Sequence, residues 1–412
     1  MCNSAWAGEK SHPSTDPAVT VPATIDHNRV VINVDIPLKD GSTASVRAWV
    51  DNGDPDLWMS RRVAELMGLS VGCEGQTCAG HTSPQMPAPE ILIGTMKVPL
   101  PSSKAINVPV NSGSAAGVIA PGMNVELNIP STALRQYDVL IDFPEHKLTI
   151  GAPGSIPFRG ESAKVVINAE NGLIQVPSRV DSKKYNLALD VGSCISFLSP
   201  DLFDKLAAAH GDWPHMTGAV GSANMWGAEE ETKWKVMRLD RVQYGPAFLT
   251  DVTFVEQSKE TADFFAKRAA IATAGLLGAS ALQNFRVGLD YAHSMVYFEV
   301  GRTTKFPDFD VVGLILRPEP LGGFTILGVA EIDGKPSVPV GPDGIQSGDS
   351  LVAVNDISVL QSTMGQVWAM LGGMPGQERR LTIRRGGEEF LVTAQVQHFL
   401  GEVPDEKERK KK

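Results

Sequence analysis

Two short segments decide the fold: Val50-Asp51-Asn52-Gly53-Asp54 and Leu189-Asp190-Val191-Gly192-Ser193. They align without a gap when the chain is laid on itself with Asp51 placed on Asp190. The match continues, because Trp58-Met59-Ser60 falls on Phe197-Leu198-Ser199 and a helix-like run follows each serine, at residues 61–67 and 200–206. An internal repeat indicates a duplicated unit. The sequence therefore predicts two similar lobes, each with a strand, an Asp-x-Gly turn, a second strand and a short helix.

A second correspondence lies near the end of each half. Ile141-Asp142-Phe143, with residues 148–150 behind it, matches Leu289-Asp290-Tyr291, with residues 296–298 behind it. Both alternate apolar and polar residues around a short polar turn, which predicts a hairpin in each lobe. Two glycine-bounded apolar pieces, residues 117–120 and 275–278, precede these hairpins and are predicted to be equivalent.

Composition narrows the class of protein. The 412 residues predict two to three domains, and the 40 glycines and 28 prolines favour a turn-rich, mostly β chain. The chain has 37 basic against 47 acidic residues and no basic stripe interleaved with aromatic residues, which argues against nucleic acid as a partner. Its longest uncharged apolar stretch, residues 269–282, is shorter than the roughly 20 residues that a membrane span needs.

A duplicated β lobe with one Asp-x-Gly per copy resembles the aspartic peptidases of the pepsin and retropepsin families, over roughly residues 28–303. The resemblance rests on Asp51 with Gly53, on Asp190 with Gly192, on Leu57-Trp58 and on residues 275–278. It implies a mostly β, bilobal pepsin-like acid protease fold, with lobes at residues 26–153 and 154–304. It also implies an aspartic endopeptidase whose catalytic pair is Asp51 and Asp190, supported by Gly53, Gly192 and Ser193.

The chemistry explains why such a pair would be duplicated. Two carboxyl groups about 3 Å apart cannot both ionise, so they share one proton. The ionised carboxylate takes a proton from a trapped water that attacks the peptide carbonyl, and the protonated carboxyl bonds the carbonyl oxygen. Glycine after each aspartate lets the main chain turn sharply and approach its neighbour. Polypeptides are the expected substrates, and neither a metal nor a cofactor is expected.

The chain departs from the family pattern at several positions. Active members typically have Thr or Ser between the aspartate and the glycine, whereas this chain has Asn52 and Val191. Asn can still donate and accept hydrogen bonds but Val cannot, so at least one tie between the lobes is expected to be missing. Asp54 adds a third carboxylate, which is expected to raise the apparent pKa values of the pair. Ala120 replaces the usual glycine after the first apolar pair, unless Gly122 serves. A catalytically weak or inactive relative that holds peptides is the alternative function.

The stretch corresponding to the substrate-covering hairpin of pepsin-like members, residues 72–96, contains no tyrosine. His81 or Gln85 would occupy its tip, or both are ordinary exposed loop residues. Cys73 and Cys78 enclose four residues, a spacing that suits a disulfide, while a zinc site would require more ligands than His81 alone. Cys194 is expected to be a buried small apolar residue.

Residues 311–398 resemble a PDZ domain, a small β barrel with helices. The run Gly344-Ile-Gln-Ser-Gly-Asp349-Ser-Leu-Val-Ala-Val-Asn355 is similar to the glycine-aspartate signature of bacterial PDZ domains. The resemblance implies binding of peptide C-termini through backbone N–H groups. It assigns a carboxylate-binding loop to Leu321, Gly322, Gly323 and Phe324, a strand to residues 325–329, a groove helix to residues 366–371 and a closing hairpin to residues 381–385 and 390–396.

The termini are expected to be flexible. Residues 1–25, rich in Ser, Pro, Thr and Ala, suggest a tether, and residues 399–412 a charged, solvated tail. Cys2 is either a chance cysteine or the lipid-bearing first residue of a bacterial lipoprotein whose signal peptide has been removed. The second alternative predicts a protein of the periplasm or cell envelope.

Overall fold

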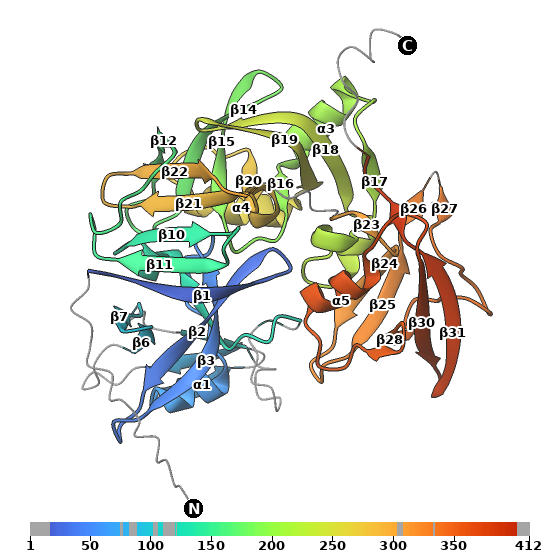
Figure 1. Ribbon diagram of the computed structural model, residues 1–412, viewed down its shortest axis with the longest axis horizontal. Helices are drawn as coiled ribbons and strands as arrows, with labels where there is room; N and C mark the ends of the chain where they lie inside the picture. Colours follow the sequence, from blue (N-terminus) through green and yellow to red (C-terminus); the bar gives the residue numbers. More distant parts are fainter. Residues whose placement is uncertain are drawn as a thin grey trace, which may run out of the picture.

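The computed structural model describes residues 17–74, 77–81, 89–101, 106–109, 120, 122–302, 308–332 and 334–401. The described chain is mostly β, and Figure 1 shows two lobes, in blue to yellow, with an orange and red barrel beside them. No helix among the described residues is long and apolar enough to cross a membrane.

A sheet shared by both lobes forms the centre of the molecule. The predicted hairpins are confirmed: β10 (Asp138–Asp142) pairs with β11 (Lys147–Gly151), and β21 (Phe285–Asp290) pairs with β22 (Met295–Val300). The hairpins join through antiparallel pairing of β10 with β21, with Leu140 opposite Gly288. These two residues are also equivalent in the sequence repeat, so a pseudo-twofold axis passes between them. β1 (Ala18–Asp26) and β12 (Glu161–Lys164) flank the hairpins in symmetric places.

The predicted flexible segment, residues 1–25, was wrong over its last eight residues, which lie in β1. The composition of this stretch suggested a tether, but Val19, Val21 and Ile25 alternate with polar residues and pack on the core. The strand pairs with β11 up to Pro22 and with β2 (Arg29–Pro37) from Ala23. Proline is tolerated at this switch of partners because no regular ladder bond is lost there.

The first lobe continues the shared sheet outward from β1. The order is β1-β2-β3-β9, and β3 (Thr43–Asp51) ends at the first aspartate. β6 pairs with β2, and β7 pairs with β6. A separate three-stranded sheet has the order β4-β5-β8. The remaining elements are β4 (Ser70–Glu74), β5 (Thr77–His81), β6 (Glu90–Ile93), β7 (Met96–Pro99), β8 (Ile106–Pro109), β9 (Leu127–Pro130), α1 (Arg61–Leu66) and α2 (Ser131–Leu134).

The second lobe is built on an eight-stranded sheet of order β13-β14-β15-β20-β16-β19-β18-β17. β15 (Lys183–Asp190) ends at the second aspartate. Both predicted helices after the Asp-x-Gly strands are present, as α1 and α3. The other elements are β13 (Val166–Ile167), β14 (Ile174–Val180), β16 (Ser196–Leu198), β17 (His215–Thr217), β18 (Lys235–Tyr244), β19 (Ala247–Glu256), β20 (Gly275–Gly278), α3 (Pro200–Ala209) and α4 (Lys259–Arg268).

Local capping explains where α1 and α3 begin. The Ser60 hydroxyl accepts the N–H of Val63 at 3.1 Å, which satisfies a free donor in the first turn of α1. α3 begins at Pro200, as predicted, because proline presets the helical φ angle and has no N–H to satisfy. Ser199 stands at the N-cap of α3, but its side chain makes no capping bond.

The repeat pairs β9 with β20, not residues 117–120 with β20 as predicted. β9 runs parallel to β3, with Pro130 beside Asp51, and β20 runs parallel to β15, with Gly278 beside Asp190. Each aspartate strand therefore has one parallel neighbour in the same position. The sequence hid this equivalence, because Pro130 stands in the first lobe where the second lobe has glycine. Residues 117–119 lie outside the described residues.

The C-terminal barrel has the strand order β24-β25-β28-β30-β31, with β29 paired to β28. The predicted strand, helix and closing hairpin are confirmed as β25, α5, and β30 with β31. Thr363 and Gln366 form a capping box at the start of α5. Bounds are β24 (Leu314–Pro318), β25 (Phe324–Val329), β28 (Ser350–Val354), β29 (Ile357–Ser358), β30 (Glu378–Arg385), β31 (Glu388–Gln395) and α5 (Met364–Leu371), with short strands β23 (Asp310–Val311), β26 (Glu331–Ile332), β27 (Lys335–Pro336) and β32 (Gln397–His398).

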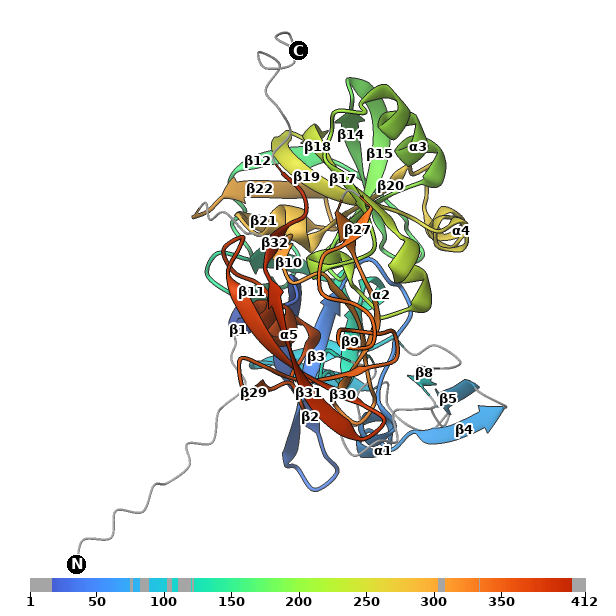
Figure 2. The same ribbon diagram turned by 90° about the vertical axis from the view of Figure 1, so that its right-hand side faces the viewer.

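The barrel contacts both lobes, in front of which it lies in Figure 2. A single apolar cluster joins Val220 and Ala223 of the second lobe to Ile315 and Leu316 of the barrel. On the first lobe, the Thr363 hydroxyl donates to the Asp26 carboxylate at 2.9 Å at the start of α5. These contacts make the barrel part of one packed body.

The predicted charged tail, residues 399–412, was wrong at its start. Phe399 and Leu400 are buried, and the Arg238 guanidinium donates to the Leu400 carbonyl at 2.7 Å. Two apolar side chains ahead of the charged run are enough to anchor this end of the chain. The rest of the predicted tail lies outside the described residues.

Candidate active site

The two predicted aspartates lie at the ends of equivalent strands and meet in the centre of the molecule. Both are buried, with 4% of Asp51 and 6% of Asp190 exposed. A Cβ atom added to Gly192 would lie 2.2 Å from Asp51 Oδ1 and 3.2 Å from Asp190 Oδ1, and one added to Gly53 would lie 2.1 Å from Asp190 Cγ. The two carboxyl groups therefore converge on one small volume, and both glycines are required for this close approach.

The backbone of each Asp-x-Gly turn holds its own carboxylate. Asp51 Oδ1 accepts the N–H groups of Gly53 and Asp54, both at 3.2 Å. Asp190 Oδ1 accepts the N–H groups of Gly192 and Ser193, at 2.9 and 3.0 Å. This twofold arrangement leaves the Oδ2 atoms of both carboxyl groups for a ligand.

Ser193 does not support Asp190 through its hydroxyl. The hydroxyl donates instead to the Ile195 carbonyl at 2.7 Å, so only the backbone N–H of Ser193 touches the aspartate. The predicted support is thus confined to the main chain. A buried hydroxyl needs a hydrogen-bond partner, and here that partner is the Ile195 carbonyl.

Asn52 ties the first lobe to the second. Its Nδ2 donates to the Leu189 carbonyl at 2.9 Å, and its Oδ1 accepts the Val191 N–H at 2.8 Å. Asn52 is fully buried, as is Val191, whose side chain has no polar group to return the tie. The Asn52 amide thus makes two hydrogen bonds to the second lobe, one as donor and one as acceptor. The reciprocal hydrogen bond from the Val191 side chain is missing, as predicted.

Burial and mutual repulsion raise the pKa values of the pair. Burial, then the Asp190 carboxyl, then that of Asp54 raise the pKa of Asp51 well above its ordinary value. Burial raises the pKa of Asp190 to about 6, against the lowering effect of its two N–H donors, with a further increase from Asp54. Interacting groups titrate together. The pair consequently retains a proton at pH values where an isolated aspartate is ionised.

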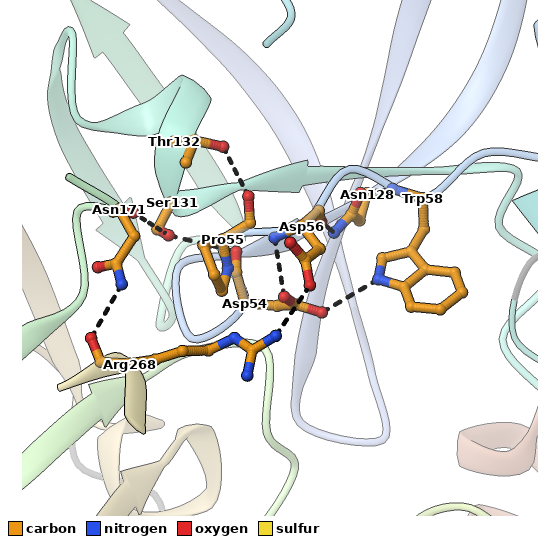
Figure 3. Close-up of polar contacts among 9 residues, drawn as sticks. All are labelled: Asp54, Pro55, Asp56, Trp58, Asn128, Ser131, Thr132, Asn171 and Arg268. Atoms are coloured by element: carbon orange, nitrogen blue, oxygen red, sulfur yellow. Dashed lines mark hydrogen bonds and ion pairs between the residues drawn. The ribbon is translucent and has the colours of Figure 1, made fainter. Parts of the chain in front are cut away.

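Asp54 stands beside the pair and is held in place by its own neighbours. Its Oδ1 accepts the Asp56 N–H at 2.9 Å and its Oδ2 accepts the Trp58 indole N–H at 3.1 Å. Figure 3 shows this carboxylate pointing between Trp58 and the loop carrying Pro55 and Asp56. Asp54 also lines the pocket described next, so a third carboxylate faces the space in front of the dyad.

A pocket of about 400 Å³ opens over the two aspartates. Its floor is formed by Asp51, Asp190 and the two glycines, and its walls are mainly aromatic, a composition suited to holding apolar side chains of a ligand. The wall residues are Trp49, Trp58, Ala120, Phe197, Met225, Trp226, Trp234, Gln257, Ser258, Thr261, Phe264, Phe265 and Leu276.

Helix α4 forms one wall and is pinned across the cleft by Arg268. The guanidinium lies 3.7 Å from the Phe264 ring centroid and 3.4 Å from Asp56 Oδ2 of the first lobe. The Arg268 carbonyl accepts the side-chain amides of Asn168 and Asn171, at 2.8 and 2.9 Å. The Arg268–Asp56 and Arg268–Asn171 contacts in Figure 3 hold the end of α4 close to the loop that follows Asp51.

Arg29, next to the pocket, and Trp226, in its wall, were not predicted from the sequence. Arg29 is almost fully buried, lies 4.7 Å from the Trp226 ring centroid and donates to the Met225 carbonyl at 3.0 Å. It contributes a positive charge that lowers the pKa of Asp190. Arg29 follows a polar turn and Trp226 lies in a stretch without a counterpart in the first lobe, so the repeat gave no signal for either residue.

The predicted cysteine pair is described only by its backbone. Cys73 of β4 lies directly opposite Cys78 of β5 in the ladder, and their side chains lie outside the described residues. The disulfide stays a prediction, as do the role of the His81 side chain and those of Gln85 and Cys2, which lie outside the described residues. Cys194 is fully buried, as predicted. The described residues hold no group of three or more His, Cys, Asp or Glu side chains arranged for a metal ion.

The predicted carboxylate-binding loop is a tight hairpin turn between β24 and β25. The Gly322 N–H donates to the Glu319 carbonyl at 2.9 Å, and the Glu319 N–H donates to the Gly323 carbonyl at 2.8 Å. Phe324 is buried in the β25 ladder, while Leu321 is 78% exposed. The loop therefore lacks the three free N–H groups that the prediction required, because closing the hairpin already uses one of them.

The chain resembles solved structures of known proteins. The chain is similar to the solved structure of an aspartic proteinase from Irpex lacteus, with 14% sequence identity and a TM-score of 0.42. The alignment covers 71% of this chain and 99% of that chain. No protein-family model and no curated protein matches the sequence.

Proposed function

We propose that this chain is an aspartic endopeptidase that hydrolyses peptide bonds with a water molecule activated by Asp51 and Asp190. The observation that carries the proposal is the convergence of two buried carboxyl groups. Each accepts hydrogen bonds from its own pair of backbone N–H groups, and the two pairs stand at equivalent positions of the two turns. Such a pair keeps one proton and one negative charge, which supplies an acid and a base at one place.

In the proposed reaction, the ionised carboxylate removes a proton from water as the water oxygen bonds to the peptide carbonyl carbon. The protonated carboxyl gives its proton to the carbonyl oxygen. When the carbon–nitrogen bond breaks, the nitrogen leaves with a proton from the pair, and a new carboxyl and a new amine result. The aromatic walls of the pocket would hold the side chains on either side of the bond.

The alternative is a peptide-binding protein with little or no turnover. Three observations favour it. The Val191 side chain makes no hydrogen bond to the first lobe, the Ser193 hydroxyl donates to the Ile195 carbonyl and not to Asp190, and Asp54 adds a negative charge beside the pair. Each of these weakens the support of the dyad and leaves the pocket intact. Both functions predict binding of extended polypeptide, and only the first predicts cleavage.

Substitution of one aspartate separates the two functions. Wild type, Asp51→Asn and Asp190→Asn are compared for cleavage of an unfolded protein at mildly acidic pH, with Asp240→Asn on the exposed side of β18 as the control. Cleavage by wild type and the control, lost in both dyad variants, supports the endopeptidase. A wild-type chain that binds a statine-type transition-state mimic but cleaves nothing supports the binding protein.

We further propose that the barrel is a PDZ domain whose strand for adding a peptide is β24. β24 is the edge strand of its sheet, and α5 runs beside it: the Val312 N–H donates to the Leu371 carbonyl at 3.0 Å at one end. An edge strand next to a helix is the arrangement to which extended peptides add. This proposal replaces the loop at residues 321–324 as the binding element.

A further inference from the structure

The outer edge of β24 is already bonded by the chain itself. The Leu316 N–H donates to Asn224 Oδ1 at 2.9 Å, and Asn224 Nδ2 donates to the Leu316 carbonyl at 3.0 Å. These are the two main-chain groups that Leu316 would offer to an added strand. The side-chain amide of Asn224, from the second lobe, takes both of them.

Neighbouring segments fill the rest of this edge. A Cβ atom on Gly227 would lie 2.6 Å from Arg317 Cα, and Gly227 has a φ angle of 68°. Glycine is therefore needed both for the close contact and for the backbone conformation. From the first lobe, Gly122 fits between Pro318 and Met364 of α5, and its carbonyl accepts the Met364 N–H at 2.6 Å. The second lobe thus lies against β24, and the first lobe lies between β24 and α5.

A buried carboxylate holds the inserted segment of the second lobe. Glu231 is fully buried; its Oε1 accepts the Trp226 N–H at 2.6 Å and its Oε2 accepts the Gly227 N–H at 3.2 Å and the Asn224 amide at 2.5 Å. These three hydrogen bonds satisfy the buried carboxyl group and fix its orientation. Asn224 is therefore fixed from one side by Leu316 and from the other by Glu231.

The same inserted segments form the pocket walls. Trp226 and Met225 line the pocket on the side of the second lobe, and Ala120 lines it on the side of the first. The Trp226 ring lies 6.0 Å from that of Trp49, which packs with Ala120 and Met123 in one apolar cluster. The same short stretches of chain therefore contact both the barrel and the pocket.

We propose that Asn224 is an internal ligand of the barrel: it occupies the peptide-adding edge of β24 and so positions Trp226 in the wall of the cleft. Asn224 is a positioning residue, since it touches neither aspartate. An external peptide reaches Leu316 only when Asn224 leaves, so occupancy of the barrel and the shape of the cleft are linked. The kinetic part of this inference rests on the proposed endopeptidase function, and the assignment of β24 as a peptide-adding edge rests on the proposed PDZ domain.

The test compares Asn224→Ala with Asn186→Ala, a matched control whose side chain makes one bond, to the Ala272 carbonyl, away from the pocket. In wild type, the Trp226 indole resonance is assigned by its loss in Trp226→Phe. We expect Asn224→Ala to shift this resonance and to raise KM about tenfold with kcat within about twofold, because the wall binds ground state and transition state alike. The control should change neither.

Two further results keep the inference falsifiable. In wild type, the Leu316 amide should exchange with solvent as slowly as the ladder amide of Arg317, a measurement that needs no variant. Fast exchange at Leu316, or an Asn224→Ala protein with an unchanged indole resonance and KM, would overturn the proposal. If wild type shows no turnover, the endopeptidase function fails, while the indole shift and the amide exchange still decide the role of Asn224.

Discussion

The side chain of Asn52 in the first lobe makes hydrogen bonds to the second lobe on both sides of Asp190. It donates to the carbonyl of Leu189 and accepts the N–H of Val191, so it fixes the backbone immediately before and after the second aspartate. The Val191 side chain has no polar group and therefore makes no equivalent hydrogen bond to the first lobe. The position of one aspartate relative to the other therefore depends on a single amide.

Replacing this amide should destabilise the protein. Asn52→Ala leaves a buried carbonyl and a buried N–H without partners, and each unpaired group costs about 1–3 kcal/mol. We expect the free energy of unfolding to fall by about 2–6 kcal/mol, measured by urea denaturation. Asn52→Thr, whose hydroxyl both donates and accepts, should lose clearly less. Equal losses in the two variants would show that the hydrogen bonds are not what matters.

The glycines of the two turns allow a prediction about activity. In Gly192→Ala the added methyl group would overlap Asp51 Oδ1, 2.2 Å away, and force the carboxyl groups apart. A shift of about 1 Å at reacting groups can cost about a hundredfold in rate, so we expect at least that loss in kcat/KM for peptide cleavage. Gly211→Ala, where the added atom meets nothing within 4 Å, is the control and should keep full activity.

Asp54 should set the upper pH limit of the reaction. Its negative charge raises the pKa values of both Asp51 and Asp190, which favours the singly protonated pair at higher pH. Asp54→Ser removes this charge, so the pKa values fall and the alkaline limb of the kcat/KM profile should move to lower pH. Asp56→Asn, two residues further along the same loop, tests whether any nearby charge has the same effect. An unmoved limb in Asp54→Ser would contradict this role of Asp54.

The sequence predicted the positions of the repeated elements better than their partners. The Asp-x-Gly strands, the helices α1 and α3 and the hairpins of the shared sheet follow from alternation and from a repeat that both lobes keep. The two aspartates were predicted because each copy of the repeat has a glycine two residues after its aspartate, and in this structure both glycines permit the close approach of the carboxyl groups. Residues 18–25 were misjudged because composition suggested a tether, although apolar residues alternate there to make β1.

Contacts between distant segments left no local signal. Pro130 obscured the equivalence of β9 with β20, since the parallel ladder, and not the residue type, makes the two strands equivalent. The hydrogen bonds between Asn224 and Leu316 join residues far apart in sequence, one in the second lobe and one in the barrel. The turn at Gly322 looked like a binding loop because glycines serve both purposes, and only the bond to Glu319 distinguishes them.

Arg268 should influence substrate binding more than stability. Its ion pair with Asp56 is partly exposed, and such pairs contribute less than about 1 kcal/mol to the free energy of unfolding. Its guanidinium also packs on Phe264, which lines the pocket, so Arg268→Ala should loosen that wall and raise KM about threefold to tenfold. Lys267→Ala on the same helix is the control. A large loss of stability with an unchanged KM would contradict this prediction.

Glu231 should make stability depend on pH near neutrality. Burial raises the pKa of Glu231 from 4.5 to about 7, against the lowering effect of its hydrogen bonds to Trp226, Asn224 and Gly227. A carboxyl group whose pKa is raised on folding stabilises the protein below its unfolded pKa, and this contribution is lost as pH rises through the folded value. The free energy of unfolding should therefore decrease between about pH 4.5 and about pH 7, by on the order of 3 kcal/mol from this group.

Chemical denaturation at several pH values measures this decrease. Glu231→Gln cannot ionise, so its free energy of unfolding, although lower overall, should fall less steeply over the same pH range than that of wild type. The dyad also titrates with raised pKa values, so the comparison is made in the Asp190→Asn background, where the shared titration of the pair is removed. Parallel pH curves for the two proteins would contradict this prediction. They would mean that the pKa of Glu231 is not raised and that the carboxyl group that bonds Trp226 and Asn224 is ionised over the whole pH range.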